Sequence, residues 1–303
     1  MRIGYPCVNL FLPCSASRTF RLRSYSDERL RETVDSNLSC LETILSFNAE
    51  RGIRFFRISS DLVPFASHRV CAYPWQRRFR ERFAEIGRAA RAAGMRFSMH
   101  PDQFVLVNAK DAKIFESSRR ELVYHAEVMD LMGLPSEAKI QIHVGGVYDD
   151  KDASMERFAK RFGALPESVK RRLAVENDDR LYCVADCMRI HEATGLPVIF
   201  DSFHHELKNE GETLSEALGM AASTWGRSDG LPMVDYSSQQ RGARPGAHAE
   251  TIDAADFKRF LKLTKPHDFD LMLEIKDKEI SAERAMNLAS GDRRLSGGSA
   301  RRR

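Results

Sequence analysis

Residues 197–207 read PVIFDSFHHEL, an apolar run that stops at a carboxylate and two imidazoles. The β-branched and aromatic residues of 198–201 predict a short strand, because such side chains pack well on a pleated surface. A strand without polar alternation is typical of a parallel sheet that is covered on both faces. Asp201 ends this strand and His204 follows three residues later. The stretch therefore predicts a parallel sheet with polar chemistry at the carboxyl end of a strand.

The same kind of short apolar run recurs along the whole chain. The predicted strands are Arg2–Tyr5, Ile53–Ile58, Arg96–Met99, Ile140–His143, Leu173–Glu176, Val198–Asp201, Met233–Tyr236 and Asp270–Ile275. Between them, apolar residues three or four positions apart predict amphipathic helices. These helices cover residues 27–49, 77–93, 113–131, 153–170, 181–193, 212–224, 254–264 and 279–289.

Strict alternation of eight strands with eight helices predicts an α/β fold, a TIM (β/α)₈ barrel. A doubly wound open sheet is the alternative. It is disfavoured because YPCVNL follows the first strand, where a dinucleotide-binding sheet carries a GxGxxG turn. We expect residues 1–289 to form a single domain.

Charge is concentrated at the end of the chain. The last fourteen residues, SGDRRLSGGSARRR (290–303), hold five Arg and one Asp, and their charge of +4 equals that of the whole chain. This segment is predicted to be a basic, disordered tail. The remainder is neutral by count, so the overall charge cannot be used to argue for a nucleic-acid partner.

Cysteine usage and hydropathy point to the compartment. The six Cys are scattered without a CxxC pair, which predicts reduced thiols in a cytoplasmic protein. No apolar run is long enough to span a bilayer, and the N-terminus alternates like a strand rather than like a signal peptide. We expect no membrane partner and a monomer.

Polar side chains follow nearly every predicted strand, at the barrel face where TIM-barrel active sites lie. The candidates in chain order are Tyr5, Asn9, His68, His100, Gln103, His143, Glu176, Asp201, His204, Asp235, His248, Glu274 and Lys276. So many carboxylates and imidazoles at one end of the barrel would repel or desolvate one another, unless a cation binds them.

The mixture of imidazole and carboxylate suits Mn²⁺, Zn²⁺ or Fe²⁺ and is too rich in nitrogen for Ca²⁺. Eight candidate ligands exceed the needs of one ion, so we expect two or three ions with Glu176 as the bridge.

Four motifs, HPDQ (100–103), HVGG (143–146), ENDD (176–179) and DSFHH (201–205), stand in this order at predicted strand ends. Together with YPCVN (5–9), FRISSDLVPFASH (56–68) and MLEIKDKE (272–279), they make the chain resemble the UV-damage endonuclease family, to about residue 290. The resemblance implies a barrel related in architecture to endonuclease IV. It also implies a DNA repair enzyme that nicks double-stranded DNA immediately 5′ to cyclobutane pyrimidine dimers and 6-4 photoproducts. Such an enzyme needs a divalent metal, typically Mn²⁺ with Zn²⁺ or Mg²⁺ as alternatives, and uses neither ATP nor another nucleotide cofactor.

The resemblance also implies residue roles. The implied metal ligands are His100, His143, Glu176, Asp201, His204, His248 and Glu274, with Asp235 in a ligand position. His68 would lie near the scissile phosphate. Residues expected at the lesion are Tyr5, Asn9, Gln103 and Phe104.

The sequence departs from the family pattern at two places. Three basic residues are further candidates for phosphate contacts. Met233 and Asp235 stand where many members have Lys-x-His, and Phe104 stands where members often have Tyr. The first departure puts a third ion in doubt. Arg241 and Arg244 are candidates for a phosphate patch. Lys276 is predicted to contact a phosphate, or else to form a salt bridge with Asp277 or Asp235.

Two other functions fit part of the pattern. A metal-dependent sugar isomerase or epimerase also places Glu, Asp and His at strand ends. It is disfavoured because two-ion isomerases need fewer ligands and because the SSDLVPFASH loop suits a long substrate. A catalytically inactive DNA-damage binder is disfavoured because the ligand set is nearly complete.

Overall fold

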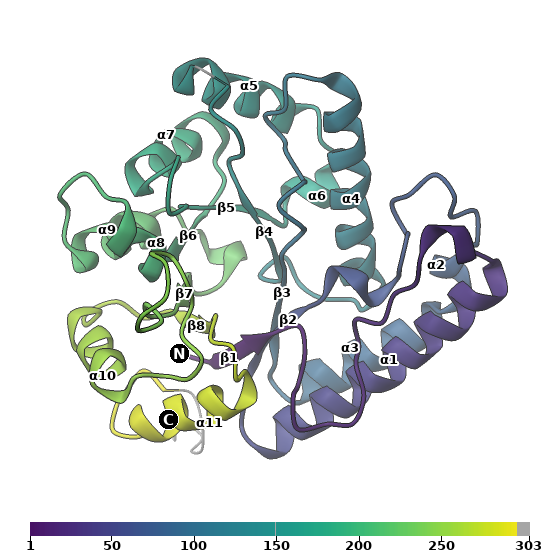
Figure 1. Ribbon diagram of the computed structural model, residues 1–303, viewed down its shortest axis with the longest axis horizontal. Helices are drawn as coiled ribbons and strands as arrows, with labels where there is room; N and C mark the ends of the chain where they lie inside the picture. The colour runs from purple at the N-terminus through teal and green to yellow at the C-terminus, as the bar shows by residue number, and fades with distance from the viewer. Residues whose placement is uncertain (149, 296–303) are drawn as a thin grey trace.

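The computed structural model describes residues 1–148 and 150–295. Eight parallel strands close into a barrel in chain order, with the eighth strand paired to the first (Figure 1). They are β1 (Ile3–Pro6), β2 (Phe55–Ile58), β3 (Arg96–Met99), β4 (Lys139–His143), β5 (Leu173–Glu176), β6 (Val198–Asp201), β7 (Met233–Tyr236) and β8 (Asp270–Leu273). The predicted (β/α)₈ barrel is confirmed.

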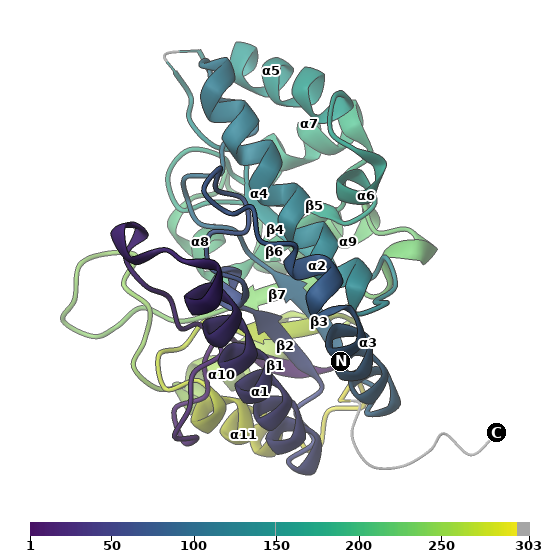
Figure 2. The same cartoon turned by 90° about the vertical axis from the view of Figure 1, so that its right-hand side faces the viewer.

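Helices surround the barrel (Figure 1), and α1, α3 and α4 pack side by side along its outside (Figure 2). The α-helices are α1 (Asp27–Glu50), α2 (Trp75–Arg78), α3 (Arg80–Ala92), α4 (Ala112–Leu131), α5 (Lys151–Gly163), α6 (Glu167–Lys170), α7 (Val184–Thr194), α8 (Ser202–Leu207), α9 (Leu214–Ser223), α10 (Ala254–Leu263) and α11 (Glu279–Leu288). Three 3₁₀ turns accompany them, η1 (Leu22–Ser24), η2 (Ser60–Leu62) and η3 (Arg227–Asp229).

Local chemistry explains where helices begin and break. Asp150, Thr213 and Asp253 accept hydrogen bonds from backbone N–H groups at the starts of α5, α9 and α10. The helix predicted for residues 153–170 is instead two helices, α5 and α6. The break falls at Pro166, which has no N–H to continue a helical ladder.

The barrel interior is arranged in layers because every second strand residue points inward. A middle layer is apolar and consists of Phe55, Ala174, Ile199, Met233 and Met272, with Trp225 packed against it. Asp270, two residues before Met272 on β8, is buried and forms an ion pair of 2.9 Å with the buried Arg96 on β3. Two residues after the members of the apolar layer lie the polar side chains at the carboxyl ends of the strands. The apolar layer thus separates two polar ends.

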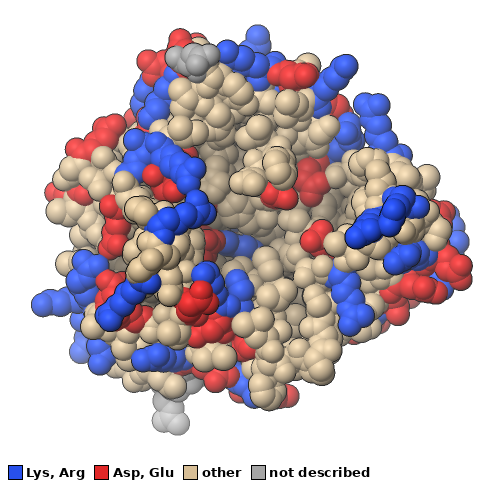
Figure 3. All heavy atoms as spheres, viewed as in Figure 1, with Lys and Arg blue, Asp and Glu red and all other residues tan. Residues whose placement is uncertain are grey.

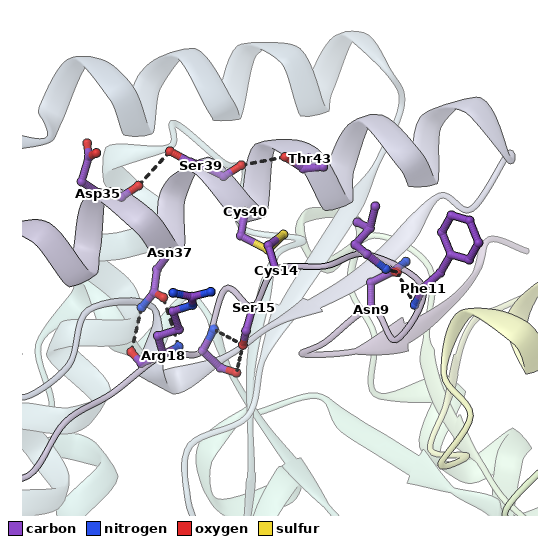
Figure 4. Close-up of a disulfide and its surroundings, with 12 residues drawn as sticks. Asn9, Phe11, Cys14, Ser15, Arg18, Asp35, Asn37, Ser39, Cys40 and Thr43 are labelled. Carbon is purple, nitrogen blue, oxygen red and sulfur yellow. Dashed lines mark hydrogen bonds between the residues drawn. A yellow bond between two sulfur atoms is a disulfide. The ribbon is translucent and has the colours of Figure 1, made fainter.

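The expectation that all six cysteines are reduced thiols is wrong for two of them. A disulfide joins Cys14, in the loop between β1 and α1, to Cys40 on α1 (Figure 4). The loop folds back onto the helix, where the Arg18 N–H donates to Asn37 Oδ1 and Asn37 Nδ2 donates to the Arg18 carbonyl, both at 3.0 Å. This long-range packing brings the two sulfurs together, and sequence spacing carried no sign of it. Cys7, Cys71, Cys183 and Cys187 are free thiols.

The chain end departs from expectation at residues 290–295. The Arg294 guanidinium donates to the carbonyls of Thr264, His267 and Leu261, and Leu295 packs against the core. The packed structure therefore continues to Leu295, beyond the predicted boundary at residue 289. The rest of the predicted tail, residues 296–303, lies outside the described residues. None of the described helices is long and apolar enough to cross a membrane.

Candidate metal centre

Two groups of potential metal ligands meet at Glu176, at the carboxyl end of the barrel. His100, His143 and Glu176 form one group, and Glu176, Asp201 and His204 form the other. His100 Nε2 lies 3.2 Å and His143 Nε2 3.7 Å from Glu176 Oε2. His204 Nδ1 lies 3.3 Å from Glu176 Oε1 and 3.4 Å from Asp201 Oδ2. Each carboxylate oxygen of Glu176 therefore faces a different group.

The DSFHH motif positions the second group through a helix cap. Asp201 ends β6, and its Oδ1 accepts a hydrogen bond of 2.7 Å from the His204 N–H at the start of α8. The same side chain presents Oδ2 to the His204 ring. His205, the next residue, turns away, with its ring 5.4 Å from Phe200 and its Nδ1 3.6 Å from Glu212. The three-residue spacing thus brings one imidazole of the pair to the barrel mouth.

A cavity of about 470 Å³ opens beside the ligand groups. Its lining residues include His100, Gln103, His143, Asp179, Arg180 and His204. Figure 3 views the face with the loops that follow the strands, and it shows that face hollowed over the barrel. The ligand groups can therefore be reached from solvent by a substrate.

Burial affects the two carboxylates of this centre differently. It raises the pKa of Asp201 well above its usual value, although the nearby His204 opposes the rise. Burial would lower the pKa of His204, but Asp201 and Glu176 outweigh it and raise that pKa to about 11. Burial also disfavours ionised Glu176, but His143 and His100 hold its pKa well below the usual range.

Asp201 Oδ2, a buried atom of the centre, has no hydrogen-bond partner among the described residues. A buried carboxylate oxygen left without a partner is what a divalent cation would satisfy. The residues present therefore fit a metal ion.

Of the three other predicted ligands, Asp235 and Glu274 pair with the buried Arg57, and His248 contacts Glu274. Arg57 Nη2 lies 2.7 Å from Asp235 Oδ2, and Arg57 Nη1 pairs with Glu274. His248 Nδ1 donates to the Glu274 carbonyl at 2.8 Å. Burial raises the pKa of Asp235 to about 7 against the influence of Arg57, whereas Arg57 overcomes burial and lowers that of Glu274 to about 2. Within the described ranges, neither ligand group includes Asp235, His248 or Glu274.

The prediction missed Arg57 and Gln141. Gln141 Nε2 donates to Glu176 Oε2 at 2.6 Å and to Asp235 Oδ2 at 2.5 Å, while its Oε1 accepts from Arg57. Both residues have the inward parity of their strands, and a charged residue inside FFRI was the available signal.

Tyr5 and Asn9, two residues predicted to lie at the lesion, are buried. The Tyr5 side chain is 0% exposed, and its hydroxyl donates to Asn48 at 2.7 Å and accepts from Asn9 Nδ2 at 2.8 Å. Asn9 is buried as well. The Tyr5 ring is therefore buried and held by two hydrogen bonds, and its place at the lesion stays a prediction.

The remaining predicted residues lie in exposed loops. Phe104, beside Gln103, is 73% exposed, and the Arg241 side chain is 94% exposed. Arg244 is exposed on the same loop as Arg241. His68 is exposed, with Nδ1 accepting from the Val70 N–H.

Lys276 forms a surface ion pair of 2.5 Å with Glu250. This partner is neither Asp277 nor Asp235, so the two salt bridges predicted as alternatives are wrong.

Comparison with known proteins gives one consistent family. The model of the UV-endonuclease UvdE family matches residues 1–296. The UV DNA damage endonuclease of Clostridium perfringens (strain 13 / Type A) is 33% identical over 289 residues, which cover 95% of this chain and 70% of that protein. That of Bacillus cereus (strain ATCC 10987 / NRS 248) is 32% identical over 291 residues, covering 93% and 92%.

Among solved structures, the crystal structure of SacUVDE superposes with a TM-score of 0.92 at 43% identity, covering 96% of this chain and 98% of that chain. A D-psicose 3-epimerase from Clostridium cellulolyticum H10 superposes with a TM-score of 0.54 at 11% identity, covering 82% and 92%. At that identity the second likeness shows the barrel fold alone.

Proposed function

The chain belongs to the UV-endonuclease UvdE family, and on that premise we propose that it is a metal-dependent DNA repair endonuclease. We propose that it cuts the phosphodiester immediately 5′ to a UV photoproduct and needs no ATP. The observation that carries the proposal is the meeting of two ligand groups at Glu176, beside a cavity open to solvent.

The ligand groups support a binuclear centre. His100, His143 and Glu176 would hold one ion, and Glu176, Asp201 and His204 would hold another. Mn²⁺ is the metal we propose, as the family resemblance implies, with Zn²⁺ or Mg²⁺ as alternatives. Carboxylates suit Mn²⁺ and Mg²⁺, and imidazoles suit Zn²⁺. When bound, divalent ions acidify water and offset the charge that develops on phosphate oxygens.

The protein's own contribution is to hold the ligands in place. Asn177 donates from Nδ2 to the Asp201 carbonyl and accepts from the Asp201 N–H at Oδ1, both at 2.9 Å. His204 Nδ1 lies 3.0 Å from the Asn177 carbonyl. These contacts tie the ends of β5 and β6 to α8, so the ligands are arranged before substrate arrives, which favours both binding and rate.

Exposed loops supply the proposed DNA contacts. Phe104 presents an aromatic ring to solvent beside Gln103, and Gln103 lines the cavity. A crosslinked pyrimidine pair stacks poorly, so separating it from its neighbours costs less than separating intact bases. A ring pressed against the duplex converts this difference into selectivity. Arg241 and Arg244 are proposed to contact phosphates, and His68 is proposed to lie near the scissile phosphate.

The test is cleavage of supercoiled plasmid, irradiated or not, after the protein has been freed of metal and resupplied with Mn²⁺. We expect nicking of irradiated plasmid that stops with a chelator and does not need ATP. An end-labelled duplex with one cyclobutane dimer then locates the cut, expected immediately 5′ to the dimer. Nicking of neither plasmid contradicts the proposal, and binding without nicking indicates a damage-binding protein.

A further inference from the structure

The arginine loop, residues 14–25, is part of the connection between β1 and α1. It contains Arg18, Arg21 and Arg23 and no Asp or Glu. All three arginines are exposed, and within residues 1–148 and 150–295 none of their side chains forms an ion pair. Three like charges on one short loop produce a local positive potential, which attracts an anionic partner.

Covalent and polar contacts hold the arginine loop in place at its beginning. Cys14 is joined to Cys40 on α1 (Figure 4). A few residues later, the Arg18 backbone exchanges two hydrogen bonds of 3.0 Å with the Asn37 side chain. A loop that is already held loses less conformational freedom on binding, so more of its interaction energy appears as affinity.

Aromatic contacts place the other end of the arginine loop beside His68. The ring of Phe65, in the loop that follows β2, lies 5.1 Å from the Phe20 ring and 5.9 Å from the Tyr25 ring. The His68 ring lies 6.3 Å from the same Phe65 ring. Arg29, in the first turn of α1, adds a further cation 5.1 Å over the Phe20 ring. Because His68 is proposed to lie near the scissile phosphate, the arginines are close to the proposed path of the DNA.

The arginine loop belongs to the same face of the molecule as the cavity. Figure 2 shows the connection between β1 and α1 and the loop after β7 projecting on the same side of the barrel. The loop after β7 carries Arg241 and Arg244, for which phosphate contacts are proposed. Figure 3 shows Lys and Arg atoms on the lobe at the right of the hollowed face, where Figure 1 draws the start of α1. A duplex has one negative charge per about 1.7 Å of its axis, so a duplex that extends from the cavity over this lobe presents phosphates to the arginines.

We infer that the arginine loop binds backbone phosphates of the duplex outside the cavity. The inference rests on the proposed function and adds a second contact surface for the same substrate. Phosphate contacts fix the position of a protein on DNA and carry no information about the bases. The loop therefore increases affinity for damaged and intact duplex by the same factor, and its arginines are positioning residues.

The salt dependence of binding tests this without cleavage. A labelled intact duplex is titrated with protein at several KCl concentrations, and fluorescence anisotropy gives Kd at each. Each phosphate contact contributes about 0.9 to the slope of log Kd against log KCl concentration. We expect Arg21→Gln/Arg23→Gln to bind more weakly than the wild type, with a slope smaller by about 1.8. On a duplex with one cyclobutane dimer, we expect the loss in kcat/KM to arise from KM.

Lys170→Gln/Arg171→Gln is the matched control, because it removes the same charge at the opposite end of the barrel. Both residues precede β5, and they pair with Glu167 and Asp130. This variant should keep the wild-type affinity and slope.

A wild-type slope in Arg21→Gln/Arg23→Gln would overturn the inference while leaving the proposed function intact. An equal change in both double variants would overturn it as well, because net charge alone would then explain the loss. A wild type that binds neither intact nor damaged duplex would instead remove the proposed function on which the inference rests.

Discussion

Glu176 is the one side chain that both ligand groups share, with each carboxylate oxygen facing a different group. Replacing it with Gln keeps the size and removes the charge that two cations would share. We predict that Glu176→Gln loses both manganese ions and more than about 100-fold of the cleavage rate, the upper end for residues that merely orient ligands. Isothermal titration with Mn²⁺ and plasmid nicking measure the two effects.

Glu250→Gln is the control for that change, since Glu250 is an exposed carboxylate paired with Lys276. It should keep both ions and the wild-type rate. Retention of both ions by Glu176→Gln would show that the two groups do not depend on a shared carboxylate.

Phe104 carries the proposed discrimination between damaged and intact DNA, because its ring is exposed next to Gln103, which lines the cavity. An aromatic ring stacked on a base contributes about 1–3 kcal/mol. We therefore predict that Phe104→Ala lowers kcat/KM on a dimer-containing duplex by roughly 5- to 150-fold, with Phe104→Tyr close to the wild type. Fluorescence anisotropy on intact duplex is the companion measurement. An equal loss of affinity for intact DNA would make the ring a general DNA contact.

At the residue level, the sequence pointed to ligands at strand ends because parity along a strand determines which side chains face inward. That reasoning found His100, His143, Glu176 and Asp201, and the structure groups them. Strand parity could not predict which residues each side chain contacts in the folded protein. Lys276 pairs with Glu250, which folds near it through the loop before α10.

Among the elements, the disulfide between Cys14 and Cys40 fastens the β1–α1 loop to α1 over a sequence separation of 26 residues. Closing a loop of this length restricts the unfolded chain and stabilises the fold by about 3 kcal/mol. We predict that a reductant lowers the free energy of unfolding of the wild type by this amount. Urea unfolding with and without reductant measures it.

Two cysteine variants separate this effect from other thiol chemistry. Cys40→Ser should match the reduced wild type and respond no further to reductant. Cys71→Ser, which removes a free thiol, should keep the full response. A wild type whose stability is independent of reductant would contradict the assigned role of the disulfide.

His125 makes the packing of α4 against the loop after β2 depend on pH. It is fully buried, with Nδ1 2.7 Å from the Glu121 carbonyl and Nε2 3.0 Å from Ser60 Oγ. Burial lowers its pKa, although Glu121 opposes the shift. Because the unfolded chain then takes up the proton more readily, this contribution to stability is full above about pH 6.5 and is lost as pH falls through that unfolded value.

We predict that His125→Gln is less stable than the wild type at pH 7.5 and that the difference shrinks by up to about 1.4 kcal/mol per pH unit towards pH 5.5. Urea unfolding at several pH values measures it. A difference that stays constant with pH would assign the stability of this contact to packing alone.

At the level of elements, the spacing of apolar residues predicted all eight strands. Short buried strands are continuous apolar runs, whereas amphipathic helices place apolar residues three or four positions apart. It did not predict α8, whose six residues are too few to show a helical period. The cap by Asp201 produces that helix, and it depends on where β6 ends.

For the whole molecule, the layered interior places a cluster of buried charges at the carboxyl end of the barrel, above an apolar layer. The alternation of units along the sequence predicted the barrel. The sequence did not reveal how its buried charges are compensated, because that depends on contacts across the barrel such as Arg57 with Asp235. At the other end, Arg96 and Asp270 compensate each other, whereas Asp201 Oδ2, in the centre around Glu176, has no hydrogen-bond partner among the described residues. The molecule as a whole should therefore respond to divalent metal.

We predict that Mn²⁺ raises the melting temperature of the metal-free protein. Ligand at 100 times its Kd stabilises a one-site protein by about 2.7 kcal/mol, so two ions would add about 5 kcal/mol. For a chain of this size, that corresponds to a rise on the order of 10 °C. Differential scanning calorimetry in chelator and in excess Mn²⁺ measures it. Glu176→Gln should melt at one temperature in both solutions, because the residue that both ions share is gone. Equal melting temperatures for the wild type would mean that the buried carboxylates are compensated within the protein, and the proposed metal centre would then have to be abandoned.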